Sequence, residues 1–293
     1  MHPIFYCLST GISIILRYMV RMTVLASGSR GNTAVLSSSG TSILIDAGIS
    51  CRETLRRMRG AGEDPAQLSA IVITHEHSDH ISGLGVLARK LKIPVYITGH
   101  THQEWQRWVR GPVTKQAQLY EDDDKAHLDR CEHFRAGERF TIGDIEVLPF
   151  TIPHDAADPV GFVFRTEGVK IGMATDLGYM PASIKIHLRG CDALVLESNH
   201  DLEMLRGGPY PWSVKQRVMS RVGHLSNDSL AEFFSSDYDG GAAFLVLAHL
   251  SEANNHPELA RQAAERALGG RLNLIQNRLV LASQNEPMEA IRF

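Results

Sequence analysis

A short histidine-rich segment has the residue types and the spacing of a metal site. It reads His75-Glu-His77-Ser-Asp79-His80 and places three imidazoles and one carboxylate within six positions. Side chains two apart on an extended segment point to the same side, so His75 and His77 leave the segment in the same direction. Nitrogen and oxygen donors gathered in one small volume suit zinc, manganese or iron(II). A polar turn that is rich in histidine by chance is the alternative.

The elements on either side of this segment must bring its side chains together. Residues 70–74 form an apolar, partly β-branched run, which predicts a buried strand that ends at the segment. Residues 80–91 predict a helix, which Ser78 could cap. Asp79 and His80 would then lie in the first turn of that helix and face the end of the strand.

Further candidate ligands follow other predicted strands: Asp46, His154, Asp176 and His249. Taken alone, each has an ordinary explanation, because strand-end aspartates often form turns and single histidines often lie on the surface or in the core. Their importance depends on their order along the chain relative to the histidine-rich segment.

The remainder of the chain predicts alternating runs of strands and helices. The predicted strands are 22–27, 33–36, 42–46, 93–97, 139–142, 145–152, 161–166, 170–175, 193–197, 243–248, 273–276 and 278–282. The predicted helices are 50–59, 101–110, 181–188, 213–221, 227–235 and 257–268, and residues 111–130 predict a loop. Two runs of mostly antiparallel strands, each followed by helices, predict an α/β (α+β) fold of two packed mixed β-sheets with helices on both outer faces.

The cluster resembles the His-x-His-x-Asp-His signature of the metallo-β-lactamase superfamily, and the other candidates follow the superfamily's order. The resemblance implies an αββα sandwich and two divalent metal ions, Zn²⁺ or Mn²⁺, with a bridging hydroxide as the nucleophile. It implies that one ion is held by His75, His77 and His154, and the other by Asp79, His80 and His249. Asp176 would bridge both ions, and Asp46 would support the cluster by hydrogen bonding.

Residues 26–32, 196–200, 223–227 and 249–255 are similar to the WalJ (YycJ) group of DNA-directed exonucleases within that superfamily. The resemblance extends from about Met22 past Pro257, and Ala253 departs from it where a charged or polar residue is expected. It implies that the enzyme is a phosphodiesterase, an exonuclease whose substrate partner is DNA. The alternatives are an RNA-processing or small-molecule phosphodiesterase and a thioesterase- or lactamase-type acyl hydrolase, because these enzymes share the ligands.

The resemblance also suggests residues with catalytic roles, namely Asp79 and His224. In related nucleases a histidine between the bridging aspartate and the last ligand protonates the leaving oxygen, and His224 is the candidate here. A purely structural role for His224 is the alternative, and Glu197 would orient it or support the adjacent loop. Asn32, in a glycine-rich turn, is a candidate contact to a substrate phosphate, with a plain hairpin loop as the alternative.

Composition sets broad limits on function and location. A net charge of −3 over 293 residues favours neither general nucleic-acid binding nor binding to a membrane surface. The nearest approach to a basic surface comprises Arg52, Arg56, Arg57, Arg59, Lys90 and Lys92. The four cysteines (Cys7, Cys51, Cys131 and Cys191) are scattered without a Cys-x-x-Cys motif. They indicate free thiols in a reducing compartment, so we expect a cytoplasmic protein without a membrane partner.

Residues 1–21 are predicted to be an extension that precedes a single domain spanning 22–293. We interpret the extension as a disordered segment or as the product of an upstream translation start. Its apolar run, residues 4–16, is shorter than the ~20 residues that span a bilayer, and no basic residue precedes it. A membrane anchor is the less favoured alternative.

Overall fold

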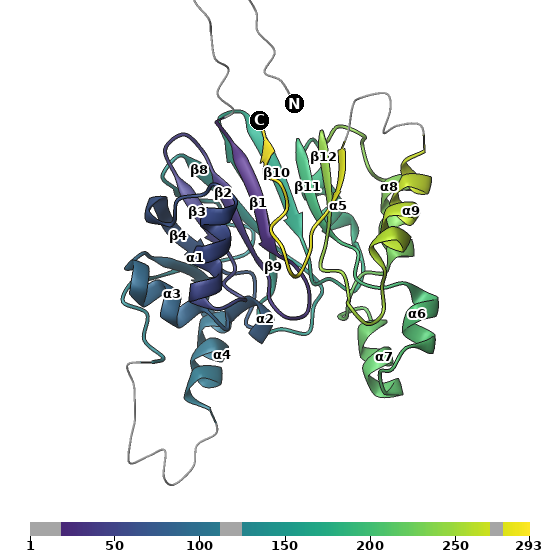
Figure 1. The fold of residues 1–293 in the computed structure, drawn as a ribbon, viewed down its shortest axis with the longest axis horizontal. Coiled ribbons are helices and arrows are strands. Elements are labelled where there is room, and N and C mark those ends of the chain that lie inside the picture. The colour runs from purple at the N-terminus through teal and green to yellow at the C-terminus, as the bar shows by residue number, and fades with distance from the viewer. Residues whose placement is uncertain (1–18, 112–124, 270–277) are drawn as a thin grey trace, which may run out of the picture.

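The computed structural model describes residues 19–111, 125–269 and 278–293. Within these residues the strands form two seven-stranded sheets (Figure 1). The first sheet has the order β14-β1-β2-β3-β4-β5-β6, and the second has the order β13-β12-β11-β10-β9-β8-β7. The first sheet consists of β1 (Arg21–Ala26), β2 (Thr33–Ser37), β3 (Ser42–Ile45), β4 (Leu68–Val72), β5 (Val95–Thr98), β6 (Cys131–Phe134) and β14 (Ile291–Arg292). The second consists of β7 (Phe140–Ile142), β8 (Ile145–Thr151), β9 (Val160–Thr166), β10 (Val169–Ala174), β11 (Ala193–Glu197), β12 (Phe244–Ala248) and β13 (Arg278–Leu281).

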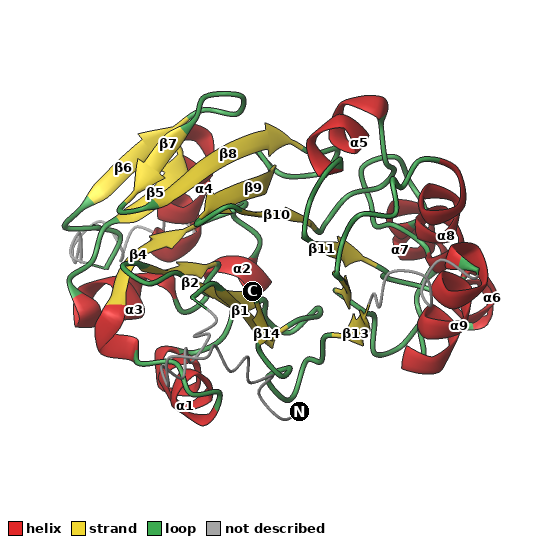
Figure 2. Cartoon of the chain, turned by 90° about the horizontal axis from the view of Figure 1, so that it is seen from above, coloured by secondary structure: helices red, strands yellow, loops and turns green. Residues whose placement is uncertain are grey.

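Helices cover the outer face of each sheet, and Figure 2 shows α1 and α3 on one side and α8 and α9 on the other. The α-helices in the described residues are α1 (Cys51–Gly60), α2 (Ser78–Ile81), α3 (Leu84–Leu91), α4 (Gly99–Arg110), α5 (Ala182–Leu188), α6 (Leu202–Gly207), α7 (Trp212–Val218), α8 (Asn227–Ser236) and α9 (Pro257–Leu268). None of them is both long and apolar enough to cross a membrane.

The alternation of side chains along the strands builds three apolar layers. On β3, Ile43 and Ile45 pack between the two sheets, whereas Leu44 packs under the helices of the first sheet. Another apolar cluster lies between the second sheet and its helices. Because neighbouring side chains of a strand point to opposite faces, a strand that is apolar at every position requires cover on both faces. The predicted sandwich of two sheets between two helical layers is confirmed.

Each sheet changes from antiparallel to parallel pairing at its middle strand. The strands from β14 to β3 and from β7 to β10 pair antiparallel, whereas those from β3 to β6 and from β10 to β13 pair parallel. The prediction of mostly antiparallel strands is therefore wrong for half of each sheet. Parallel strands need crossover helices, and their carboxyl ends share one edge of the sheet.

Several element predictions need correction. The helix predicted over 80–91 is two helices, and Ser78 is the first residue of α2 rather than its cap. No sequence pattern predicts β6, β14 or α6, which are short and lack a clear periodicity. β13 pairs with β12, while its predicted partner, 273–276, lies outside the described residues.

The predicted start of the domain at Met22 leaves out two residues that belong to the fold. Arg21 opens β1 and Val20 is 1% exposed, while the amide of Phe293 donates to the carbonyl of Val20. These residues therefore belong to the folded domain. The remainder of the predicted extension, residues 1–18, lies outside the described residues.

Candidate metal centre

Three residues of the centre follow strands in a left-handed backbone conformation. Asp46 follows β3 with φ 58°, His249 follows β12 with φ 55°, and Asp176 lies two residues beyond β10 with φ 61°. This region is uncommon for residues other than glycine, although aspartate and histidine enter it more often than most. Each of these side chains is at most 2% exposed and meets the histidine-rich segment at the same edge of the sheets.

Glycine allows the loop after β3 to approach α2 closely. A Cβ added to Gly48 would lie 1.6 Å from the carbonyl oxygen of Asp79, so no larger residue fits there. The amide of Asn32 donates to that same oxygen at 2.6 Å, and the amide of Ala47 donates to the carbonyl of His80 at 2.8 Å. Backbone hydrogen bonds therefore fix the position of Asp79 and His80 against two loops.

His75, His77 and His154 form the first group of candidate ligands. One nitrogen of each ring lies within 4.8 Å of the others. Nε2 of His154 lies 3.1 Å from Nδ1 of His77, and Nε2 of His75 is buried without a hydrogen-bond partner. Two imidazole nitrogens on one tetrahedral ion with bonds of ~2.0–2.1 Å lie about 3.4 Å apart. The three rings thus have a spacing that fits one shared ion.

Asp79, His80, Asp176 and His249 form the second group. Oδ2 of Asp79 lies 3.4 Å from Nε2 of His249 and 3.5 Å from Nε2 of His80. Oδ2 of Asp176 lies 3.3 Å from Nε2 of His80. That oxygen is buried and has no hydrogen-bond partner among the described residues. With the other side chains of the group, it would complete the ligand shell of one ion. The uncompensated acceptor fits a cation at this position.

Asp176 lies between the two groups. Its Oδ1 is 3.4 Å from Nδ1 of His249 and 4.0 Å from Nε2 of His154, so the carboxylate reaches rings from both groups. A carboxylate can coordinate two ions through its two oxygens, whereas an imidazole nitrogen coordinates one. The structure thus brings all seven predicted ligands into one contiguous cluster at the sheet edge.

Hydrogen bonds at Nδ1 orient four of the rings so that Nε2 is directed into the cluster. Nδ1 of His75 contacts Oγ1 of Thr74 at 3.0 Å, and Nδ1 of His154 contacts the carbonyl of Gly223 at 3.2 Å. Nδ1 of His80 contacts Asp46, and Nδ1 of His249 contacts Glu197. Such acceptors fix the tautomer of a histidine ligand and make its other nitrogen a better donor to metal.

Asp46 has the supporting place that the sequence resemblance implies. Its carboxylate lies 2.7 Å from Nδ1 of His80 and accepts hydrogen bonds from the amide and the hydroxyl of Thr74. The side chain is fully buried. Because Thr74 also contacts Nδ1 of His75, one carboxylate orients histidines of both groups. The role of Thr74 was not predicted, because its only sequence signal is its place directly before the cluster.

Burial and neighbouring charges shift the pKa values of the histidines in the cluster. Burial lowers the pKa of His75 well below its ordinary value, which keeps the ring neutral and able to bind metal. Burial acts in the same direction on His80 and His249, but the charge of Asp176 and of other nearby carboxylates outweighs it and raises both pKa values. An ion bound here would balance the carboxylate charge in place of those protons.

Asn32 is closer to the cluster than predicted and is already engaged. It is 5% exposed, and Nδ2 donates to Oδ2 of Asp79 and to the carbonyl of Gly28, both at 3.1 Å. Its Oδ1 accepts a hydrogen bond from the amide of Gly28 at 2.8 Å. These contacts favour a positioning role toward Asp79 over the phosphate contact that the sequence suggests.

Glu197 links His224 to the cluster. Its Oε1 lies 2.8 Å from Nδ1 of His224 and 2.8 Å from Nδ1 of His249, and Oε2 accepts hydrogen bonds from the amides of Leu177 and Leu225. The sequence suggests that Glu197 orients His224, but it gives no sign of the contact to His249. His224 is 21% exposed at its side chain and lies 3.8 Å from Asp176.

Glu197 and His224 shift each other's pKa values. Burial would raise the pKa of Glu197, but the charge of His224 and hydrogen bonds from both histidines lower it to about 2. Burial would lower the pKa of His224, but the charge and hydrogen bond of Glu197 raise it. The carboxylate of Glu197 therefore favours the protonated form of His224.

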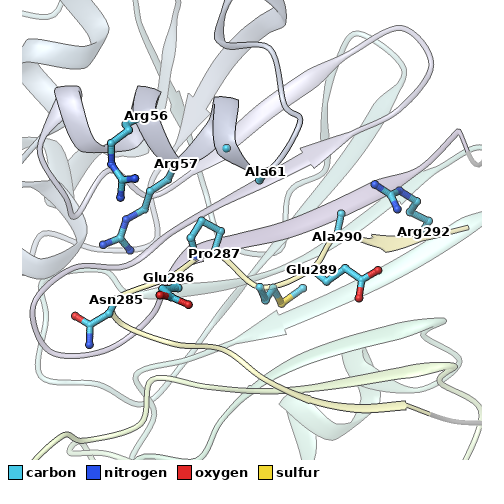
Figure 3. A pocket seen from close by; sticks show the side chains of 11 residues that line it. Arg56, Arg57, Ala61, Asn285, Glu286, Pro287, Glu289, Ala290 and Arg292 are labelled. Atoms are coloured by element: carbon cyan, nitrogen blue, oxygen red, sulfur yellow. The ribbon is translucent and has the colours of Figure 1, made fainter. Parts of the chain in front are cut away.

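Two arginines of the predicted basic surface make contacts within the fold. Arg56 and Arg57 both bind the carboxylate of Glu53, and Arg57 is 9% exposed, donating to the carbonyls of Leu25 and Gln284. Figure 3 shows these two arginines at a surface pocket of ≈ 590 Å³ between α1 and the C-terminal segment. None of the proposed metal ligands lines this pocket. The patch therefore gives little support for a nucleic-acid surface.

The fold and the cluster agree with the family comparison. A family model described as "Beta-lactamase superfamily domain" matches residues 41–249. The chain belongs to the metallo-β-lactamase superfamily. The crystal structure of the metallo-β-lactamase fold protein YhfI from Bacillus subtilis superimposes with a TM-score of 0.65 at 16% identity, covering 92% of this chain and 99% of that one.

Two curated relatives within the superfamily match most of the chain. Exodeoxyribonuclease YycJ of Bacillus anthracis is 39% identical over 249 residues, which cover 85% of this chain and 89% of the relative. Exodeoxyribonuclease WalJ of Streptococcus pneumoniae (strain D39) is 36% identical over 240 residues, 82% of this chain and 85% of the relative. The chain is thus similar to the group that the sequence motifs indicate. The protein is a metal-dependent hydrolase.

Proposed function

We propose that the protein is a binuclear metal-dependent phosphodiesterase that degrades DNA as an exonuclease. The observation that supports this most directly is the pair of ligand groups joined by Asp176. The similarity to two exodeoxyribonucleases over more than four fifths of the chain supports DNA as the substrate.

The proposed ligand assignment follows the two groups in the structure. His75, His77 and His154 would hold one ion, Asp79, His80 and His249 would hold the other, and Asp176 would contribute to both. Zn²⁺ and Mn²⁺ both suit this mixture of imidazole nitrogens and carboxylate oxygens. Two ions held by these groups would supply an activated water as the nucleophile and would neutralise charge on the phosphate.

His224 supplies a proton in the proposed reaction. A phosphodiester expels a sugar alkoxide, which leaves poorly near neutral pH unless it is protonated. Glu197 raises the pKa of His224 and contacts its Nδ1, which leaves Nε2–H as the group that donates the proton. Asp79 would contribute as a ligand whose Oδ2 accepts a hydrogen bond from Nδ2 of Asn32, and its side chain is 19% exposed, so it borders the space that a substrate must enter.

Exposed side chains on the helices that flank α2 suit the binding of a nucleic-acid strand. Figure 1 shows α2 at the lower edge of the molecule, with α4 on one side and α6 and α7 on the other. Trp212 on α7 is 62% exposed and Trp108 on α4 is 50% exposed, and exposed aromatic rings stack bases. Arg217 on α7 is 59% exposed and binds Asp155, the residue after His154, which places a cation beside the first group.

The test combines metal analysis with a panel of end-labelled substrates. Metal-free full-length protein is reconstituted with Zn²⁺ or Mn²⁺, its bound metal is counted, and it is then given single- and double-stranded DNA. We expect two ions that depend on these seven ligands and stepwise shortening of DNA from one end. Thioester turnover without DNA cleavage would refute the nuclease proposal, and a single ion that depends on these ligands would refute the binuclear centre.

RNA of the same sequence belongs in that panel, because an RNA-processing phosphodiesterase is the alternative within this fold. Faster turnover of RNA than of DNA would favour it.

We also propose a cytoplasmic location, which the free thiols of Cys51, Cys131 and Cys191 support.

A further inference from the structure

A second group of potential metal ligands lies outside the proposed catalytic centre, on α4 and β6. It consists of His102, Cys131 and His133, which offer two imidazole nitrogens and one sulfur within 4.8 Å of one another. None of these residues belongs to the seven proposed catalytic ligands. The two groups also differ in chemistry, because the catalytic ligands are nitrogen and oxygen atoms only.

The fold brings these three side chains together. β6 is the edge strand of the first sheet and pairs parallel with β5, and α4 begins directly after β5. Cys131 and His133 are two apart on a strand, so they point to the same face. Cys131 packs against the apolar cluster under the helices, which shows that this face is turned toward the helical layer that contains His102.

The distances within the group fit one tetrahedral ion. Nδ1 of His102 lies 3.0 Å from Nε2 of His133, and Sγ of Cys131 lies 3.6 Å from both nitrogens. With Zn–N bonds of ~2.0–2.1 Å and a Zn–S bond of ~2.3 Å, tetrahedral angles place nitrogen and sulfur about 3.6 Å apart and two nitrogens about 3.4 Å apart. The sulfur already has this spacing, and the two rings need to separate by only a few tenths of an ångström.

The positions of the rings are held by the surrounding structure. The ring of His102 stacks on Trp105, with centroids 5.9 Å apart, and Trp105 is fully buried. Nε2 of His102 has no hydrogen-bond partner among the described residues, so the polar contacts of this ring run through Nδ1. His133 is exposed and Cys131 is half-buried, so an ion can enter from solvent.

We propose that His102, Cys131 and His133 bind a zinc ion in a structural site that fixes the edge strand β6 to the first turn of α4. The sulfur and the two imidazoles select a borderline-soft ion such as Zn²⁺ over Mg²⁺ or Ca²⁺. On binding, the thiol loses its proton to solvent, and water completes the tetrahedral shell. The proposal does not depend on the function proposed for the catalytic centre.

The site would also stabilise the wall of the catalytic centre. Thr101, which precedes His102, donates from its hydroxyl to the carboxylate of Glu76 at 3.4 Å. Glu76 lies between His75 and His77, and its other oxygen accepts a hydrogen bond from the amide of Ala157 at 2.7 Å. An ion at His102 would therefore hold the turn of α4 that contacts the histidine-rich segment.

Cobalt spectroscopy separates the two metal sites, because only a thiolate ligand gives an intense near-ultraviolet sulfur-to-cobalt charge-transfer band. Metal-free full-length protein is titrated with Co²⁺ in parallel with the variants Cys131→Ser and His133→Ala. Cys7→Ser and Cys191→Ser are matched controls for two of the other three thiols. We expect the band in the wild type and in both controls and its loss in Cys131→Ser.

His133→Ala gives a second readout at an exposed position, where the change should leave the fold intact. Removing an outer partner of a metal ligand can cost roughly 100-fold in affinity, so removal of a ligand itself should weaken Co²⁺ binding at this site by at least that factor. After loading with Zn²⁺, the wild type should hold one more ion than Cys131→Ser. Absence of the band in the wild type, its persistence in Cys131→Ser, or equal zinc counts in the two proteins would overturn the proposal.

Discussion

Replacing Glu197 with glutamine tests how the chain orients two of its functional histidines. The carboxylate lies 2.8 Å from Nδ1 of both His224 and His249, and it accepts hydrogen bonds from the amides of Leu177 and Leu225 at 2.9 and 3.0 Å. These two amides are fixed donors of the backbone. In Glu197→Gln the carbonyl oxygen must therefore face the amides, and the NH₂ group must face the two imidazoles.

A donor that faces Nδ1 forces the neutral tautomer whose proton sits on Nε2. Nε2 of His249 then lacks the lone pair that binds metal, and loss of such an outer partner weakens metal binding roughly 10–100-fold. His224 simultaneously loses the negative charge that raises its pKa. Its contribution as a proton donor, roughly 10²–10⁴ in rate, should fall with it.

The assay needs three measurements on Glu197→Gln: zinc affinity by chelator competition, kcat on labelled DNA, and the pH profile of kcat. Glu197 raises the pKa of His224, so the protonated acid of the wild type persists to higher pH. In the variant we expect the alkaline limb to move to lower pH. Glu232→Gln, at an exposed position of α8, is the matched control. Wild-type zinc affinity together with an unshifted alkaline limb would refute this reasoning.

Other changes test separate parts of the site. Asp176→Ala should abolish hydrolysis and weaken at least one ion, with the fold checked by circular dichroism; wild-type turnover in this variant would contradict the two-metal mechanism. His224→Ala should keep both ions and lose about 10²–10⁴ in DNA cleavage, but much less on a nitrophenyl phosphodiester, whose acidic leaving group needs little protonation. Equal losses on the two substrates would assign His224 a structural role. A chain that starts at Met22 should still fold but unfold at lower temperature than the full chain, because it loses buried Val20 and the 2.9 Å ion pair of Arg21 with buried Glu63. Unchanged thermal unfolding would show that these two residues contribute nothing to stability.

The parts of the site that the sequence predicted are those in which local pattern and chemistry coincide. An apolar run ending at His75 predicts a strand followed by a ligand, and the same pattern precedes Asp46, Asp176 and His249. In each case the strand is short, buried on both faces and followed by a polar residue. This pattern predicts the site correctly because the buried strand holds the polar residue that follows it at the edge of the sheet.

Contacts made between distant segments could not be predicted in this way. β14 is two residues long and pairs with β1, at the opposite end of the chain, so no periodic pattern marks it. The contact of Glu197 to His249 depends on β11 lying between β10 and β12, which is a property of strand order. The break between α2 and α3 at Gly83 has a tertiary cause as well. A Cβ on Gly83 would lie 2.1 Å from the carbonyl oxygen of Ile49, so the loop after β3 determines where the helix must be interrupted.

The left-handed backbone at the metal centre distinguishes a functional site from an ordinary turn only when it is combined with burial. Positive φ also occurs at Lys92 and Glu167, at 54° and 50°, but these residues are exposed, one at the end of α3 and the other in the hairpin between β9 and β10. Glycine would suit such turns without strain. Asp46, Asp176 and His249 adopt the same conformation while at most 2% exposed, at a cost of roughly 1–3 kcal/mol each by analogy with other functional sites. Glycine would relieve that strain but has no side-chain atom for a metal ion or for a neighbouring imidazole. The strain at these three positions is therefore explained by the donor atoms they contribute, which no exposed turn requires.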